Sequence, residues 1–182
     1  MSTISEPRTA LPTGTWQVDP VHSTVAFYVK HMVVANFRGG FDTFSVTLDE
    51  TGINGTVDVA SVSVSEPNLN GHLLSPDFFD AERNPQLAFR STAIDVADGA
   101  LDIDGELTIK GVTKPVRIKG SLNGPVTHPF DGSSRIGLEL ETVIDRTAYG
   151  LDWNAPLPTG GFAVGNDVRL VAELELVLAE EA

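Results

Sequence analysis

The sequence contains no cysteine, so it has neither a disulfide framework nor a thiolate that could act as a nucleophile or metal ligand. Basic residues are also scarce, because 12 Lys and Arg stand against 25 Asp and Glu, which gives a net charge of −13. A chain with this charge repels nucleic acid and anionic membrane surfaces, and we expect no nucleic-acid partner. No apolar run approaches the roughly 18 residues of a membrane-spanning helix, so we expect no stable membrane insertion.

The first 14 residues, MSTISEPRTALPTG, lack the basic start and apolar run of a signal peptide and are rich in Ser, Thr, Pro and Gly. We therefore predict a mobile tail over residues 1–14 and a cytoplasmic location. The remaining residues, 15–182, are enough for one domain with a sizeable core and somewhat few for two. A hydrophobic fraction of 41% is that of a folded, globular chain.

Alternation of apolar and polar residues with a period of two runs through most of the chain from Trp16 onward. In LDIDGELTI, residues 101–109, apolar residues and one glycine occupy every second position, as in a strand that buries one face. Asn-Gly and Asp-Gly pairs between such segments predict turns. The pattern predicts about eight antiparallel strands, which can close as a barrel or stack as a sandwich. Small residues at inward positions would leave room inside a barrel.

One segment, NLNGHLLSPDFFDAERNP at residues 68–85, loses this alternation. Asn68 and Ser75 are candidate N-caps, and Pro76 follows the second of them, so we predict one or two short helices. The apolar side chains of this segment need a surface to cover, and the open end of a barrel offers one. The segment is therefore a candidate helical lid.

Four ordered segments match a known family: WQVDPVHSTVAFYVKHMVVANFRGGFDTFS, HLLSPDFFDAERNPQLAFRST, GELTIKGVTKPV and IDRTAYGLDWNAPLPTGGFAVGNDVRLVAELEL. Over residues 15 to about 178 the chain resembles the YceI-like family. The resemblance implies an all-β fold, an eight-stranded antiparallel lipocalin-like β-barrel that binds a polyisoprenoid or a quinone-like lipid in its interior. The residues leave the oligomeric state open, and pairing among family members makes a homodimer one expectation.

His31 ends the apolar row of the predicted strand HSTVAFYVKH, after Phe27 and Val29. Its imidazole could bond a neighbouring carbonyl as an ordinary strand-end residue, or it could meet the polar end of a lipid near the barrel mouth. Both interpretations stay open. The four histidines of the chain lack the close spacing of metal ligands, so we predict no metal site and no cofactor.

The apolar side chains predicted to face the barrel interior, among them most of the phenylalanines, form either a plain core or an apolar tunnel. On the second interpretation, Arg38 and Arg146 are candidates for a phosphate head group. For Arg146 we favour a structural corner in which it pairs with Asp145 or Asp152. The predicted ligand-binding residues are Phe27, His31, Phe37, Arg38, Phe44, Leu73, Phe78, Phe79, Phe89, Ile109, Ile118, Leu138, Arg146 and Trp153.

We predict a binding or carrier protein for a long amphiphilic lipid, with no catalytic residues. The alternative is an enzyme that acts on a bound hydrophobic metabolite, with His31 as acid or base. A third interpretation is a β-protein with a filled core and no ligand. A serine-hydrolase triad is disfavoured, because His22 and Ser23 are adjacent on a predicted strand and point to opposite faces.

Overall fold

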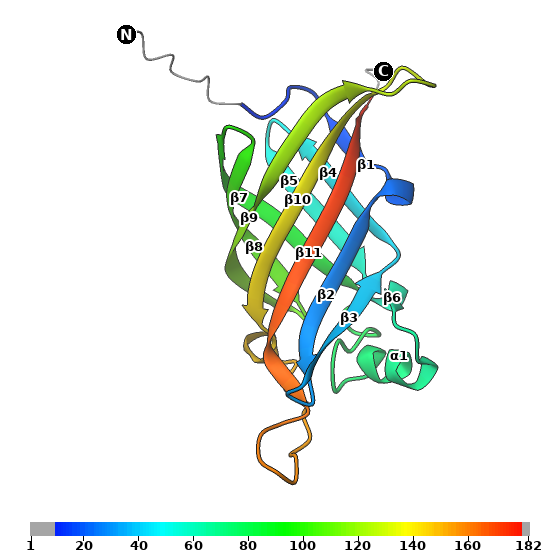
Figure 1. Cartoon of the computed structure of the whole chain (residues 1–182), viewed down its shortest axis with the longest axis vertical. Coiled ribbons are helices and arrows are strands. Elements are labelled where there is room, and N and C mark those ends of the chain that lie inside the picture. The colour runs from blue at the N-terminus through cyan, green and yellow to red at the C-terminus, as the bar shows by residue number, and fades with distance from the viewer. Residues whose placement is uncertain (1–9, 180–182) are drawn as a thin grey trace.

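A computed structural model describes residues 10–179, which form an antiparallel β-barrel with one short α-helix (Figure 1). Most of the tail predicted over residues 1–14 lies outside the described residues, and that prediction stays untested. The elements in chain order are β1 (Trp16–Val18), η1 (Pro20–His22), β2 (Thr24–His31), β3 (Ala35–Phe41), β4 (Phe44–Asp49), β5 (Gly52–Asp58), η2 (Val59–Ser61), β6 (Val62–Ser63), α1 (Pro67–Leu74), β7 (Gln86–Ala97), β8 (Ala100–Ile109), β9 (Val112–Thr127), β10 (Ser134–Asp145), η3 (Arg146–Tyr149) and β11 (Val164–Leu178).

The sheet closes on itself through β1, which pairs with β4 on one side and with β11 on the other. Three pairs of consecutive segments, β1–β2, β3–β4 and β5–β6, continue one another as interrupted strands. Eight antiparallel strands therefore surround the barrel, each hydrogen-bonded to its neighbours. The structure confirms the eight-stranded antiparallel β-barrel and excludes the sandwich.

The predicted alternation is clear in β8. In β8, Leu101, Ile103 and Ile109 are buried, whereas Asp104 and Glu106 between them are exposed. A closed sheet has only one apolar side to bury, so the period of two decides which side chains enter the interior.

Two glycines make room for phenylalanine rings inside the barrel. Gly39 lies opposite Phe27 in the β2–β3 register, and a Cβ atom at Gly39 would overlap the ring of Phe27. A Cβ atom at Gly105 would lie 2.5 Å from the ring of Phe89 on the neighbouring strand. Both rings can therefore fold against the barrel wall, because the position beneath each of them carries no side chain.

The two halves of the barrel interior are packed differently. The half that contains β1 is the upper one in Figure 1. There, side chains from most strands form one close-packed cluster, in which Leu48, Ile103, Leu138 and Leu176 are 0% exposed. Trp16 belongs to this cluster and is 3% exposed. A second cluster of buried aromatic and aliphatic residues occupies the lower half and includes side chains of α1 and of the segment after it.

Helix α1 lies at the lower end of the barrel, between β6 and β7 in the chain (Figure 1). It begins at Pro67, and the carboxylate of Glu66 caps it by accepting a hydrogen bond from Leu69 N at 2.6 Å. The predicted N-caps Asn68 and Ser75 are therefore wrong. Proline at the first helical position sets the start two residues earlier than an N-cap at Asn68 would, and Ser75 instead ends the helix. Within residues 10–179, no helix is long and apolar enough to cross a membrane.

The packed upper half predicts a large cost for removing one of its side chains. Leu138→Ala should lower the free energy of unfolding by about 3–5 kcal/mol, because the cavity left behind cannot collapse. Leu107→Ala is the matched control and should cost less, because Leu107 already borders empty space. Urea denaturation followed by tryptophan fluorescence measures both values. Equal losses for the two variants would contradict a difference in packing between the halves.

Candidate ligand-binding site

A cavity of about 430 Å³ occupies the lower half of the barrel. This volume lies within the range of about 300–1,000 Å³ that is usual for small-molecule sites. The walls come from β2, β3, β7, β8, β10 and β11 and from the β10–β11 connection, and α1 with the segment after it lies at the lower end. The lining residues are Phe27, Val29, Lys30, His31, Phe37, Phe41, Leu69, His72, Leu73, Phe78, Phe79, Leu87, Leu107, Ile109, Ile144, Arg146, Tyr149, Leu151, Trp153, Ala163, Val164, Val168 and Leu170.

A second, smaller cavity of about 150 Å³ adjoins the first. Four residues line both spaces, namely Phe41, Leu87, Leu107 and Leu170, so the two cavities are neighbours. The smaller cavity borders the packed upper half through Ile53. Apolar side chains make up most of the lining of both cavities.

The polar groups around the larger cavity carry either positive charge or none at neutral pH. They belong to Lys30, His31, His72, Arg146 and Tyr149, together with the indole of Trp153. None of the described residues that line this cavity is Asp or Glu, although acidic residues outnumber Lys and Arg 25 to 12 in the chain. The cavity therefore offers mainly hydrogen-bond donors within a strongly acidic protein.

Arg146 is 4% exposed and is held entirely by main-chain oxygens. Its Nε donates to Gly165 O at 2.8 Å, and Nη2 donates to Val164 O at 3.3 Å. Nη1 donates to Leu151 O at 2.5 Å and to Trp153 O at 3.0 Å. These bonds use four of the five N–H groups of the guanidinium and tie η3 to the start of β11.

The ion pair predicted between Arg146 and Asp145 or Asp152 is wrong. Neither carboxylate lies within ion-pair distance of Arg146 among residues 10–179, and Asp145 Oδ1 instead accepts hydrogen bonds from Thr147 N and Oγ1 at 2.9 and 2.6 Å. Burial lowers the pKa of Arg146, and the two nearby carboxylates act in the opposite direction. The guanidinium is thus a buried cation without a directly bonded anion.

Tyr149 lines the same cavity and is 2% exposed. The 3₁₀ turn η3 has about three residues per turn, so it brings the side chains of Arg146 and Tyr149 to the same side. No residue between 10 and 179 forms a hydrogen bond with the Tyr149 hydroxyl. Burial raises its pKa, which keeps the hydroxyl protonated and able to donate.

His31 lies where the burial of its strand ends. Phe27 is 7% exposed, whereas His31 is exposed and lines the edge of the larger cavity. Within the described part of the chain, no hydrogen bond involves its ring. The imidazole is therefore not bonded to a neighbouring carbonyl and stays at the mouth of the cavity.

The structure brings most of the predicted site residues together. The larger cavity is lined by Phe27, His31, Phe37, Leu73, Phe78, Phe79, Ile109, Arg146 and Trp153, and the smaller one by Phe89 and Ile118. Their roles in ligand binding stay predictions. Phe44, Leu138 and Arg38 line neither cavity.

These three residues lie elsewhere for two physical reasons. Leu138 and Phe44 do pack inward, but Leu138 belongs to the packed cluster of the upper half and Phe44 packs against that cluster. Arg38 is exposed and pairs across β2–β3 with Tyr28, whose ring faces the Arg169 guanidinium carbon at 4.2 Å. It therefore lies on the outer surface of the barrel.

His72 and Tyr149 line the cavity and were not among the predicted binding residues. The ring of His72 lies 4.9 Å from Phe78 and 4.7 Å from Trp153, both edge to face, and its Nε2 is 3.0 Å from Asp77 Oδ2. It joins the lid to the β10–β11 connection. The three-residue spacing of Arg146 and Tyr149 in a capped turn could have indicated from the sequence that both side chains face the cavity. The contacts of His72 depend on tertiary packing and could not.

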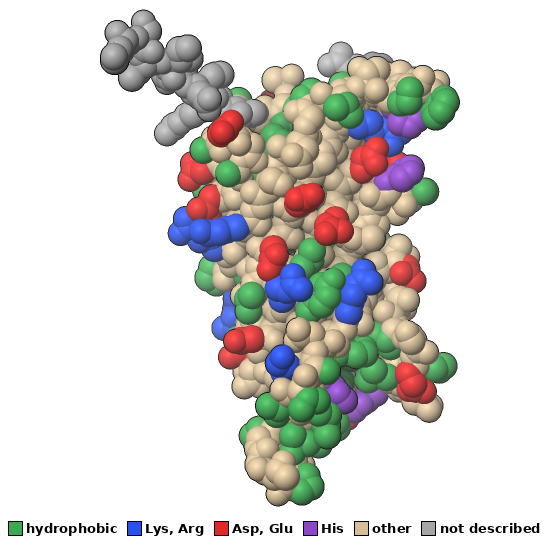
Figure 2. Space-filling model, in the orientation of Figure 1, with side chains coloured by type: hydrophobic (Ala, Val, Ile, Leu, Met, Phe, Trp, Pro, Cys, Tyr) green, Lys and Arg blue, Asp and Glu red, His purple; other side chains and the backbone are tan. Residues whose placement is uncertain are grey.

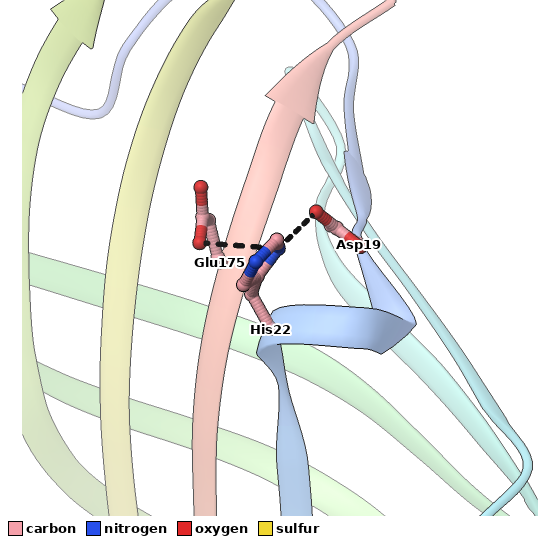
Figure 3. A group of neighbouring side chains, drawn as sticks. All are labelled: Asp19, His22 and Glu175. Atoms are coloured by element: carbon pink, nitrogen blue, oxygen red, sulfur yellow. Dashed lines mark hydrogen bonds and ion pairs between the residues drawn. The ribbon is translucent and has the colours of Figure 1, made fainter. Parts of the chain in front are cut away.

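A separate polar cluster links η1 to β11 on the outside of the barrel (Figure 3). His22 Nδ1 lies 2.8 Å from Asp19 Oδ2 and 3.9 Å from Glu175 Oε2. Arg135 Nη1 approaches the same two carboxylates at 2.8 and 3.2 Å. Asp19, His22 and Glu175 are residue types that bind metals, and they lie close together. However, Arg135 already forms ion pairs with both carboxylates. The cluster links the segment between β1 and β2 to β11.

Comparison with known proteins identifies relatives along nearly the whole chain. A family model described as the YceI-like domain matches residues 16–176. A UPF0312 protein of Staphylococcus aureus strain USA300 is 31% identical over 169 residues, which cover 89% of this chain and 96% of that protein.

Solved structures share the barrel. Burkholderia cenocepacia BcnA is 27% identical with a TM-score of 0.72 and covers 87% of this chain and 98% of its own. The Campylobacter jejuni YceI protein is 22% identical with a TM-score of 0.69 and covers 99% of both chains. A polyisoprenoid binding domain from Saccharophagus degradans is 14% identical with a TM-score of 0.69 and covers 90% of this chain and 98% of its own. The last two likenesses concern the fold alone.

The His22–Asp19 pair predicts a pH-dependent contribution to stability. The hydrogen bond between them raises the pKa of His22 and lowers that of Asp19. The raised pKa stabilises the fold below the ordinary histidine value of about 6.5, and this contribution is lost as the pH rises through the folded value. The lowered pKa stabilises the fold above the ordinary aspartate value of about 3.9, and this contribution is lost as the pH falls through the folded value.

A double-mutant cycle of His22→Asn and Asp19→Asn should therefore give a coupling free energy near pH 5.5 that shrinks near pH 9, where the histidine is neutral. Thermal unfolding at the two pH values measures it. A coupling that grows toward pH 9 would contradict the assignment.

Proposed function

Since this chain belongs to the YceI-like family, we propose that it is a carrier that holds a long amphiphile of isoprenoid or quinone type inside its barrel. The observation that carries this proposal is the apolar cavity of about 430 Å³ under the helical lid, with its smaller extension of about 150 Å³. The Saccharophagus degradans neighbour is described as a polyisoprenoid binding domain, and it supports this class of ligand.

Apolar area would dominate the affinity. Each CH₂ group of a lipid tail moved from water into the cavity contributes about 0.8 kcal/mol, so a tail of about ten carbons could bind without a strong polar contact. Phe78 and Phe79 of the lid segment and Phe27 of the wall would contact such a tail. The polar groups would then select the head group rather than supply most of the binding free energy.

The head group would be one that accepts hydrogen bonds. The Tyr149 hydroxyl has no protein partner among the described residues, and one N–H group of Arg146 is left over from its four main-chain bonds. Donors of this kind suit the carbonyl oxygens of a quinone and the phosphate oxygens of a prenyl phosphate alike. His31 at the mouth could meet a polar group that extends further out.

Binding is better supported than catalysis. A general acid or base is usually oriented by a second side chain, and no described residue hydrogen-bonds the ring of His31. The cavity also lacks a carboxylate that could serve as its partner among the described lining residues. The remaining polar groups, above all Arg146 and Tyr149, are suited to holding a ligand.

The experiment that tests this proposal is mass spectrometry of the freshly purified protein, first native and then denatured. We expect a co-purified lipid, and its released mass would distinguish a quinone from a prenyl phosphate. The native mass also tests the predicted homodimer. A protein that is empty and takes up neither a quinone nor a prenyl phosphate in a fluorescence titration would refute the proposal.

Tyr149→Phe tests the head-group contact without disturbing the fold, because it removes a hydroxyl that no described residue bonds. We expect affinity for a prenyl phosphate or a quinone to fall roughly three- to tenfold, the value of one hydrogen bond. A hydrocarbon of similar length without a head group is the matched control ligand and should bind both proteins equally. Unchanged affinity for all ligands would exclude Tyr149 from the contact.

A further inference from the structure

Two loops at the lower end of the barrel expose apolar side chains to solvent. The β2–β3 loop exposes 60% of Val33 and 83% of Val34, and the β10–β11 connection exposes 60% of Phe162. Residues 32–36 and 155–163 contain no charged residue, although 20% of the chain is charged. Figure 2 shows hydrophobic side chains gathered at this end of the molecule. We call Met32, Val33, Val34 and Phe162 the apolar tip.

A hydrogen bond and a close contact join the two loops. Met32 N donates to Ala163 O at 2.7 Å, and Leu157 N donates to Gly161 O at 2.9 Å within the longer loop. A Cβ atom built on Gly161 would lie 3.8 Å from Val33 Cγ2, so the loops are in van der Waals contact range. The two loops therefore form the apolar tip together, as one continuous surface.

The backbone of the tip is strained in a way that folding does not explain. Met32 and Val33 have φ angles of +54° and +66°, and Val34 N donates to His31 O at 3.2 Å across them. Positive φ at both central positions normally selects Asn-Gly, because side chains with a branched Cβ are disfavoured there. Exposed apolar residues in this conformation lower the stability of the free protein, and such strain points to a functional role.

The tip is continuous with the rim of the larger cavity. His31 and Ala163, which line the cavity, directly adjoin Met32 and Phe162 in the chain. A ligand that leaves past His31 would therefore emerge beside the apolar tip rather than into open water. This location suits a surface from which a lipid is taken up or to which it is delivered.

We propose that the apolar tip docks the protein onto an electrically neutral lipid bilayer, where the bound amphiphile is exchanged. The proposal rests on the proposed carrier function. The net charge of −13 repels anionic lipid, so the fitting surface carries zwitterionic head groups such as phosphatidylcholine. Lys30, next to the tip in β2, can approach a lipid phosphate. The contact is peripheral and reversible, and it differs from the stable insertion that we do not expect from the sequence.

Flotation of the full-length protein with phosphatidylcholine vesicles tests the proposal. The test variant is Val33→Asn/Val34→Ser/Phe162→Ser, which changes only exposed residues that line neither cavity. The control is Phe130→Ser, which removes a side chain that is 93% exposed, in the β9–β10 loop at the opposite end of the barrel. We expect vesicle partitioning to fall about tenfold or more in the test variant and to stay unchanged in the control.

The single variant Val33→Asn separates docking from unfolding. Asparagine tolerates positive φ better than valine, so we expect a higher melting temperature together with weaker flotation. A parallel loss of stability and flotation would instead assign the effect to damage of the fold and would count against the proposal.

Three further outcomes would overturn the inference. They are equal flotation of wild type and test variant, stronger flotation on phosphatidylglycerol vesicles than on neutral ones, and a change from dimer to monomer without a change in flotation. The last would make the tip an interface between two copies. The lipid content of the same samples, measured by mass spectrometry, reports separately on the carrier function. Bound lipid without flotation refutes only the docking, and flotation of a protein that is empty and takes up neither a quinone nor a prenyl phosphate refutes only the carriage.

Discussion

Closure of the sheet by β1 is the constraint on which the remaining structure depends. Its three residues pair with β11, and Trp16 and Gln17 also pair with β4, so β1 joins these two strands at the upper end of the barrel. Once eight strands are closed, the interior has a nearly fixed width, just enough to be filled by side chains or to hold one small ligand. The size of the inward side chains then decides which of the two occurs at each level.

The interior of the barrel is filled by side chains in its upper half and contains a cavity in its lower half. Large aliphatic side chains and Trp16 fill the upper half and supply the stabilising core. In the lower half, the wall and the lid enclose a space, so the lining side chains there lack part of the packing that a filled core provides. The stable half can support the hollow half because both belong to the same hydrogen-bonded strands. This division explains how a domain of this size combines a firm fold with an internal site.

Period-two alternation carried most of the sequence-based prediction. It identified the strands and the inward rows, and the loss of alternation identified the lid. Parity cannot say how far along the barrel axis an inward residue lies, which is why Leu138 and Phe44 were predicted for the cavity and belong to the packed half. Arg38 was predicted because it is charged and lies near a strand end. It pairs with Tyr28 on the neighbouring strand, and both side chains point outward. The main-chain partners of Arg146 come from the start of β11 and the preceding connection, which no local pattern reveals.

The glycines beneath the phenylalanine rings have a consequence for ligand selection. The width of the cavity depends on how far Phe27 and Phe89 can withdraw into the wall, and this distance is set by Gly39 and Gly105, neither of which lines either cavity. A side chain gained at either position would press a ring toward the ligand. Under the proposed carrier function, the girth of the molecule that fits inside the barrel thus depends on two residues that line neither cavity, so the ligand could change while every lining residue stays the same.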